Sequence, residues 1–213
     1  VVWDVVKVTA SSIELRYVSA DMEEGYPGKM EVNAAYSLSD ENEMHISFQA
    51  ITDKATVICL TNHAYFNLNG QGSGTILEHV LAINADNFTP IDKTSIPLGV
   101  IEPVTNTPFD FRKGMKIGER IHEPGEQLTN GSGYDHNFVL NDAGAEERMA
   151  AEATGDLTGI NMKVFTTEPG MQLYTGNFMN NENILKGGYT DGRHEAFCLE
   201  TQHFPDSPNH PDF

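Results

Sequence analysis

The feature that most constrains the fold is a two-residue alternation of apolar and polar side chains. Between positions 30 and 38, the apolar residues that fall on one side of an extended chain are Met30, Val32, Ala34, Tyr36 and Leu38. The stretch from Met44 to Ala50 repeats this period, and the Ser, Asp and Asn residues between the two stretches suit a turn. A period of two is that of a half-buried strand, so the sequence predicts a β-hairpin here, with His45 facing solvent.

Short runs of the same kind, separated by turn residues, recur along the chain. We expect strands at residues 4–8, 12–19, 55–60, 78–82, 137–140, 149–153, 161–167, 171–175 and 196–201. Only residues 109–121 suit a brief helix, and two glycines in that segment disfavour even this one. The pattern predicts an all-β fold, a mostly antiparallel β-sandwich or barrel with at most short helices, as a single domain over residues 1–213.

The acidic composition excludes two classes of partner. With 213 residues, the chain is long enough for a sizeable core without disulfides. Its 31 Asp and Glu residues against 13 Lys and Arg residues give a formal net charge of −18. Such a charge repels nucleic-acid phosphates and anionic lipid, so we expect neither nucleic acid nor a membrane surface as a partner.

The cysteines and the apolar runs indicate the cellular location of the protein. Cys59 and Cys198 are the only cysteines, too few for a disulfide framework, and we expect two buried thiols in a reducing compartment. No run approaches the roughly 20 apolar residues of a membrane-spanning helix, and the first residues lack the features of a signal peptide. The sequence therefore predicts a cytoplasmic location.

Several familiar motifs fail on inspection. The glycine-rich residues 69–75 are not followed by Lys and Ser or Thr, so we expect a flexible loop and no phosphate cradle. His203, Asp206 and His210 lie near one another in the sequence but lack the spacing of a recognised metal site. No serine lies in a nucleophile-elbow motif. The remaining candidates are single polar residues within apolar segments.

Four polar residues stand among apolar, strand-like neighbours. They are His63 in TNHAYFNLNG, Asp135 in GYDHNFVL, Gln172 in PGMQLYTGNF and Glu200 in AFCLETQHFPD. A buried polar group costs free energy unless it is hydrogen-bonded or faces a cleft. Any one of them could be a satisfied core hydrogen bond. The four together predict a shared polar cleft, because their aromatic and amide neighbours suit sugar hydroxyls.

Glu200 is the clearest of the four. The three residues before it, from Phe197 to Leu199, are apolar. Burial in such surroundings raises the pKa of a carboxyl group and makes its ionised form a base that can work near neutral pH.

Together, the segments TNHAYFNLNG, YDHNFVL, EPGMQLYTGNF and FCLETQHFPDSPNHPDF resemble the galactose mutarotase (aldose 1-epimerase) family. The stretch EEGYPGKMEVNAAYSL is similar to that family's lead-in, so the resemblance runs nearly end to end. It implies a β-supersandwich and an isomerase of hexose metabolism, which interconverts the α and β anomers of free aldohexoses such as galactose and glucose. It implies neither a metal nor an organic cofactor.

The resemblance also assigns roles to residues. It implies that His63 is the general acid on the ring oxygen of the sugar and that Glu200 is the general base on the anomeric hydroxyl. It further implies sugar contacts by Tyr65, Asp135 and Gln172. Ring opening needs one proton removed and one delivered, so a carboxylate and an imidazole are chemically sufficient.

Some elements of the family are not among the 213 residues. The family usually carries an Asn-Arg pair and a second histidine, in a His-Gly-Gly motif, upstream of the region where Val1 begins, and further strands after the N-H-P-x-F segment. We therefore expect an incomplete copy of the domain, with weak or no mutarotase activity by itself. Its unpaired sheet edges leave both a monomer and a homodimer open.

Two other functions stay open. One is a non-catalytic carbohydrate-binding domain that holds a sugar in the same cleft. The other is an epimerase for another sugar, such as a hexose 6-phosphate. Against a phosphate clamp stands the small number of arginines, which are Arg16, Arg112, Arg120, Arg148 and Arg193.

Overall fold

The computed structural model describes residues 1–142, 144 and 146–213. They divide into two compact units, Val1–Leu60 and Thr61–Phe213. The expectation of one domain over residues 1–213 stays a prediction, because this division describes only the packing inside each unit.

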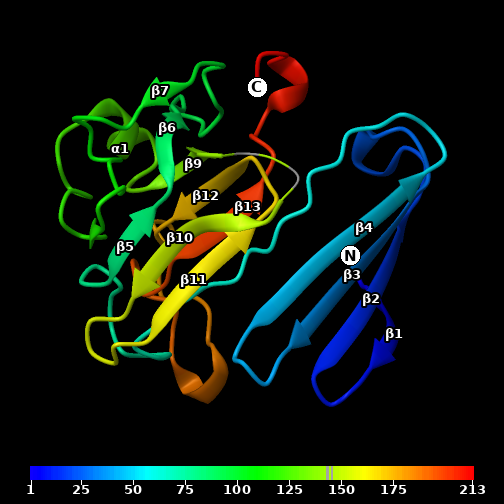
Figure 1. Cartoon of the computed structure of the whole chain (residues 1–213), viewed down its shortest axis with the longest axis horizontal. Coiled ribbons are helices and arrows are strands. Elements are labelled where there is room, and N and C mark those ends of the chain that lie inside the picture. Colours follow the sequence, from blue (N-terminus) through cyan, green and yellow to red (C-terminus); the bar gives the residue numbers. More distant parts are fainter. Residues whose placement is uncertain (143, 145) are drawn as a thin grey trace. The chain divides into compact units, whose positions relative to one another are not determined.

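The smaller unit is one antiparallel sheet with the strand order β1-β2-β3-β4, drawn in blue and cyan in Figure 1. Its strands are β1 (Asp4–Val8), β2 (Ser12–Ser19), β3 (Met30–Leu38) and β4 (Met44–Thr52), with a 3-10 turn, η1 (Glu23–Gly25), between β2 and β3. The expected hairpin is confirmed, because Leu38 pairs with Met44 across a turn that begins at Ser39. His45 is exposed on β4, as the alternation predicts.

The strand predicted at residues 55–60 is wrong. The β4 ladder ends at Thr52, whose Oγ1 donates a hydrogen bond to the carbonyl of Lys54. The chain bends at Asp53 and continues without a strand to Leu60, so its apolar residues have no ladder partner. Cys59 lies in this segment and is exposed, which corrects the expectation of two buried thiols, whereas Cys198 is buried.

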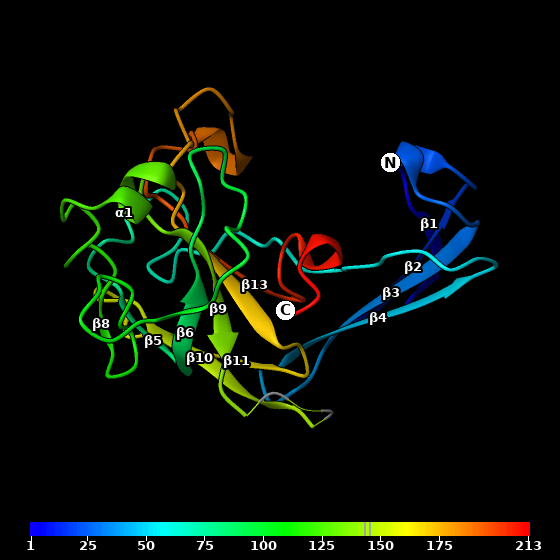
Figure 2. The ribbon, with the colours of Figure 1, turned by 90° about the horizontal axis from the view of Figure 1, so that it is seen from above.

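The larger unit contains two antiparallel sheets, which Figures 1 and 2 show as neighbouring layers. One has the order β11-β10-β5-β8, from β11 (Asn161–Thr166), β10 (Arg148–Thr154), β5 (Val80–Ile83) and β8 (Met115–Lys116). The other has the order β13-β12-β9-β6-β7, from β13 (Cys198–Gln202), β12 (Gly170–Tyr174), β9 (Asp135–Leu140), β6 (Ala85–Thr89) and β7 (Glu102–Pro103). The all-β, mostly antiparallel class is confirmed.

The helical content is small and lies elsewhere than expected. Residues 109–121 form turns and β8, because Gly114 has a φ of +73°, which a right-handed helix through this segment cannot contain. The one α-helix of the described chain is α1 (Glu126–Asn130), a single turn too short to leave a periodic signal. Two 3-10 turns, η2 (Lys186–Gly188) and η3 (Ser207–Asn209), follow later.

The core of the larger unit lies between its two sheets. Buried Leu81 and Ala153 come from one sheet, and buried Phe138, Leu173 and Leu199 from the other. Because side chains alternate along a strand, this packing turns the remaining residues of β9, β12 and β13 to the opposite face of their sheet. That second face carries the candidate site.

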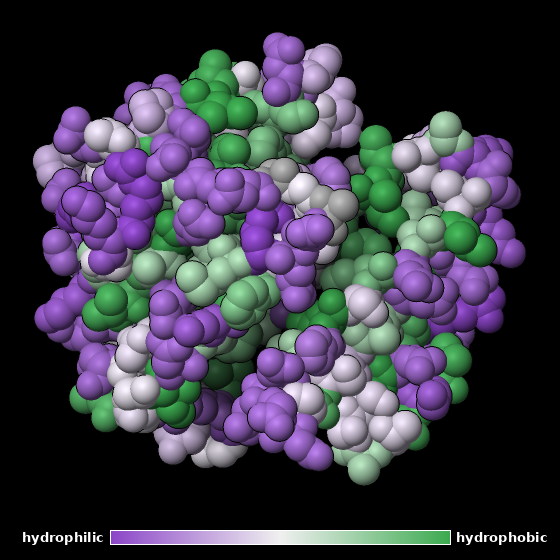
Figure 3. All heavy atoms as spheres, viewed as in Figure 1, coloured by the Kyte–Doolittle hydropathy of each residue, from purple (hydrophilic) through white to green (hydrophobic). Residues whose placement is uncertain are grey.

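The outer surface of the larger unit is largely hydrophilic on the face that Figure 3 shows. Figure 3 shows hydrophilic residues over much of this face, with smaller hydrophobic areas between them. No helix in the described part of the chain is long and apolar enough to cross a membrane.

Candidate active site

The register of three neighbouring strands brings distant polar residues together. Gln172 of β12 pairs with Glu200 of β13 on one side and with Asn137 of β9 on the other. Nε2 of Gln172 donates a hydrogen bond of 2.8 Å to Oδ1 of Asp135, two residues before Asn137. One surface therefore carries Asp135, Gln172 and Glu200, although these residues are 28 to 65 positions apart in the sequence. We call this surface the polar face of the sheet.

His63 reaches this face from a segment that is held by its backbone. The segment from Thr61 to Tyr65 belongs to no strand, but Phe66 and Phe197 exchange two backbone hydrogen bonds of 2.8 and 2.9 Å. Phe197 immediately precedes β13. The bridge therefore docks the segment of His63 against the strand that carries Glu200.

The imidazole of His63 lies directly beside the carboxylate of Glu200. The distance between Nε2 of His63 and Oε1 of Glu200 is 3.4 Å. The ring of Tyr65 stacks on the imidazole with a centroid separation of 4.9 Å, and the ring of Tyr174 meets it edge-on at 6.1 Å. The His63 side chain is 48% exposed and that of Glu200 only 11%, so the pair has one ring open to a ligand and one carboxylate largely shielded from water.

The electrostatics of the polar face favour proton transfer. Burial raises the pKa of the Glu200 carboxyl group; nearby His63 opposes this shift, and Asp135 adds to it. Burial likewise raises the pKa of Asp135, against the hydrogen bond from Gln172. A carboxylate that is deprived of water and lies near a second carboxylate binds a proton more strongly than it does in water, which is the property that a general base needs.

A hydrogen-bonded network ties down the chain that follows His63. The backbone N–H of Leu68 donates to Nε2 of buried His79, so the ring proton lies on Nδ1, which is 3.1 Å from Oδ1 of Asp156. The Nδ2 group of Asn69 donates to the same Asp156 oxygen, and Asn67 donates to the carbonyl of Glu195. Asn67 and Asn69 thus connect their segment to two distant loops, and Gly70, with a φ of +99°, continues the turn.

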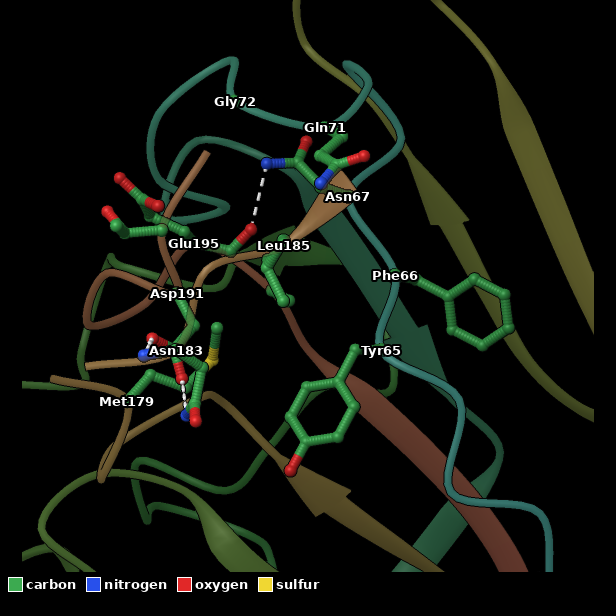
Figure 4. Close-up of a pocket in the computed structure, with 12 residues that line it drawn as sticks. Tyr65, Phe66, Asn67, Gln71, Gly72, Met179, Asn183, Leu185, Asp191 and Glu195 are labelled. Atoms are coloured by element: carbon green, nitrogen blue, oxygen red, sulfur yellow. Dashed lines mark hydrogen bonds between the residues drawn. The ribbon is translucent and has the colours of Figure 1, made fainter. Parts of the chain in front are cut away.

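A cavity of ≈ 580 Å³ opens beside Tyr65. Figure 4 shows the ring of Tyr65 on the side of its segment that faces Met179 and Asn183, whereas the ring of Phe66 points away from them. Tyr65 is the only one of the five candidate residues among the cavity's lining residues. His63 and Glu200 therefore lie beside this cavity and not in its lining.

The structure brings all five candidate residues into one neighbourhood. Asp135, Gln172 and Glu200 share the polar face, and His63 and Tyr65 lie against it. Sequence reasoning missed three further residues of this neighbourhood, which are Asn137, Tyr174 and Gln202. Gln202 donates to Oδ1 of Asn137 at 3.3 Å and to Oε1 of Gln172 at 3.4 Å. The signal that could have found them is the period of two, since Gln202 follows Glu200 by two positions and Asn137 follows Asp135 by two.

The histidines near the end of the chain form separate pairs. His203 lies 2.8 Å from Glu168, and His210 lies 3.2 Å from Asp206. Among the described residues, the one group of three or more His, Cys, Asp or Glu residues with metal-ligand proximity is His63, Cys198 and Glu200.

The family model that describes aldose 1-epimerases matches residues 1–213, which is the whole chain. The chain belongs to the aldose 1-epimerase family. Over 207 residues it is 41% identical to a galactose mutarotase from Rattus norvegicus, an alignment that covers 97% of the chain and 58% of that relative. An aldose 1-epimerase from Haemophilus influenzae is 35% identical, with 99% of the chain and 61% of the relative covered.

A solved structure supports the fold of this aldose 1-epimerase family member. The aldose epimerase homologue from C. elegans aligns with a TM-score of 0.84 and 28% identity, over 99% of the chain and 62% of that homologue. The galactose mutarotase-like fold is thereby confirmed. The chain spans about three fifths of the length of the relatives that it matches.

Proposed function

We propose that the chain carries the acid–base centre of an aldose 1-epimerase, with Glu200 as general base and His63 as general acid. The observation that carries this proposal is the 3.4 Å approach of the His63 imidazole to the buried Glu200 carboxylate. The family membership and the identity of 33–42% to curated mutarotases and epimerases support it.

The reaction follows from where the two groups lie. The anomeric hydroxyl and the ring oxygen of an aldose are bonded to the same carbon, so neighbouring acid and base groups can serve both. Glu200 takes the hydroxyl proton as His63 protonates the ring oxygen, and the bond between C1 and the ring oxygen breaks to give the open aldehyde. Rotation about C1–C2 and closure, with the two roles reversed, give the other anomer. Each group of this kind contributes about 10² to 10⁴ in rate.

The remaining candidates hold the sugar. Asp135 offers a carboxylate oxygen and Gln172 an amide to sugar hydroxyls, and the exposed ring of Tyr65 offers an apolar surface for a sugar face. The substrates we propose are free aldohexoses such as galactose and glucose. We propose that the protein acts in the cytoplasm, as a monomer or homodimer. The chain has only two cysteines, too few for a disulfide framework, which supports a reducing location.

Polarimetry on freshly dissolved α-D-galactose tests the proposal, with the matched variant Glu200→Gln as control. We expect the chain to raise the rate of mutarotation above that of the variant. We also expect a lower rate than that of full-length relatives, because the Asn-Arg and His-Gly-Gly elements of the family are not among these residues. The unmodified chain and Glu200→Gln could show the same rate while the unmodified chain still binds galactose in a calorimetric titration. The protein would then be a carbohydrate-binding domain.

A further inference from the structure

Cys198 has no part in the proposed reaction, yet its thiol lies among the reacting groups. It stands two positions before Glu200 on β13, so both side chains lie on the polar face of the sheet. One sulfur of Cys198, one ring nitrogen of His63 and one carboxylate oxygen of Glu200 all lie within 4.8 Å of one another. Both Cys198 and Glu200 are buried, whereas the imidazole is half exposed.

We propose that His63, Cys198 and Glu200 form a binding site for Zn²⁺, which inhibits the protein when it is bound. Thiolate, imidazole and carboxylate are the ligands that Zn²⁺ takes in proteins, and three protein ligands with one open position are a common arrangement. The inhibitory consequence rests on the proposed function, because the ion would occupy both the acid and the base. The binding itself does not depend on it.

The geometry needs only a small adjustment. Zinc bonds of about 2.0 Å to nitrogen and oxygen and about 2.3 Å to sulfur require the three ligand atoms to lie closer together than the 4.8 Å limit within which they lie here. The 3.4 Å between the His63 nitrogen and the Glu200 oxygen already suits a shared ion. The His63 side chain can make this adjustment by rotating its ring, because it is half exposed and its residue lies outside the strands.

The charge of the surroundings favours a cation. Asp135 and Glu200 place two carboxyl groups on one largely buried surface, and no lysine or arginine makes an ion pair with either of them among the described residues. A divalent ion would compensate this negative charge. On coordination the Cys198 thiol gives its proton to the buffer, so the bound ligand is a thiolate.

Isothermal titration with ZnCl₂ and absorption spectra with CoCl₂ test the site directly, without any sugar. We expect one Zn²⁺ per chain, and for Co²⁺ the charge-transfer absorption of a thiolate–metal bond. Loss of a residue that only hydrogen-bonds to a metal ligand lowers metal affinity by roughly tenfold or more. Cys198→Ser removes a ligand itself, so it should weaken Zn²⁺ binding by more than tenfold and should abolish the thiolate absorption. Cys59→Ser is the matched control and should bind as the unmodified chain does.

Glu200→Gln provides a second variant, since it removes a ligand oxygen without changing the size of the side chain. It should also weaken Zn²⁺ binding. The proposal is overturned if Cys198→Ser and Glu200→Gln bind Zn²⁺ as tightly as the unmodified chain, or if no thiolate absorption appears with Co²⁺.

Polarimetry then tests the inhibition. Zn²⁺ should slow mutarotation by the unmodified chain, EDTA should restore it, and Cys198→Ser should keep its rate in the presence of Zn²⁺. If the metal titration succeeds but no catalysed mutarotation is seen without metal, the zinc site stands and the proposed function fails. If Zn²⁺ binds and mutarotation continues unchanged, the inhibitory role is wrong.

Discussion

The two faces of the β9–β12–β13 sheet differ in how they treat polar groups. Asp135 and His136 are neighbours in β9, and their side chains lie on opposite faces of the sheet. On the core face, His136 is fully buried against the ring of Phe109, at a centroid distance of 4.5 Å, and Nε2 of its ring donates to Oε1 of Gln127 at 3.1 Å. Its other ring nitrogen accepts from the backbone N–H of Asp135.

On the polar face the groups are less completely paired. Nδ2 of Asn137 is buried without a hydrogen-bond partner among the described residues, and the hydrogen bonds of Gln202 are long. Two carboxyl groups there have raised pKa values. Buried polar groups without hydrogen-bond partners cost folding free energy, and they are expected where a bound ligand supplies the missing hydrogen bonds. The core face thus serves stability, and the polar face is the one that we propose binds the sugar.

The largest effect should come from His63→Ala. Removal of the general acid should lower the catalysed rate of mutarotation by about a hundredfold or more, while the free energy of unfolding changes little, because the ring is half exposed. Added imidazole should restore part of the rate, since the vacated position is open to solvent. Polarimetry with and without imidazole measures both effects. A variant with a near-normal rate would remove His63 from its role.

His136→Gln should do the reverse, lowering stability more than activity per folded molecule. Gln cannot reproduce both hydrogen bonds of the ring, and a buried group left without its partner should cost about 1–3 kcal/mol at pH 8, measured by urea denaturation. Burial lowers the pKa of His136 to about 3, so the ring is neutral in the folded protein. The unfolded chain takes up a proton below about pH 6.5, and the stability due to His136 therefore falls as the pH drops from there.

The share of His136 in the pH dependence of stability can be measured by comparing the variant with the unmodified chain. His136 contributes at most about 1.4 kcal/mol per pH unit between pH 6.5 and 3, and His136→Gln should show a flatter profile over that range. His79 and His194 also have pKa values lowered mainly by burial, and they contribute to the slope that remains in the variant. Identical slopes in both proteins would show that His136 is not held neutral by the fold.

Asp135→Asn should weaken sugar binding by about tenfold, the cost of one hydrogen bond to a charged group. The variant keeps the shape of the side chain and an oxygen that can accept from Gln172. Because burial disfavours the Asp135 carboxylate, the free energy of unfolding at pH 7 should stay equal or rise. Calorimetric titration with galactose and thermal unfolding measure the two quantities. A clear loss of stability would place Asp135 with the residues that maintain the fold.

The strands that bear the site were predictable, and their neighbours in the sheet were not. The alternation predicted β9, β12 and β13 to within two residues, since a sheet with a buried face imposes that period. The pairing of β9 with β12 and with β6 joins segments far apart in the sequence, and it depends on packing that no local pattern records.

The candidate residues show the same limit. Burial of Glu200 was predictable from the apolar residues before it, and the rise of its pKa is confirmed. The position of His63 was not, because its segment forms no strand and reaches the site through the bridge between Phe66 and Phe197. The approach of the Cys198 thiol to His63 depends on that same bridge, so nothing near Cys198 in the sequence indicates it.

The smallest effect should come from Gln202→Met, which tests whether every buried residue of the polar face is dispensable for stability. Gln202 is as buried as many core residues, at 8% exposure, but its hydrogen bonds of 3.3 and 3.4 Å are long and contribute weakly. We expect urea denaturation to show a loss of about 0.5 kcal/mol, at the low end for a hydrogen bond. Galactose affinity should fall slightly, because Gln172 loses a partner that holds its amide. A loss above about 2 kcal/mol would mean that the polar face stabilises the sheet as strongly as the core face does, and that burial rather than hydrogen-bond pairing decides which residues the fold needs.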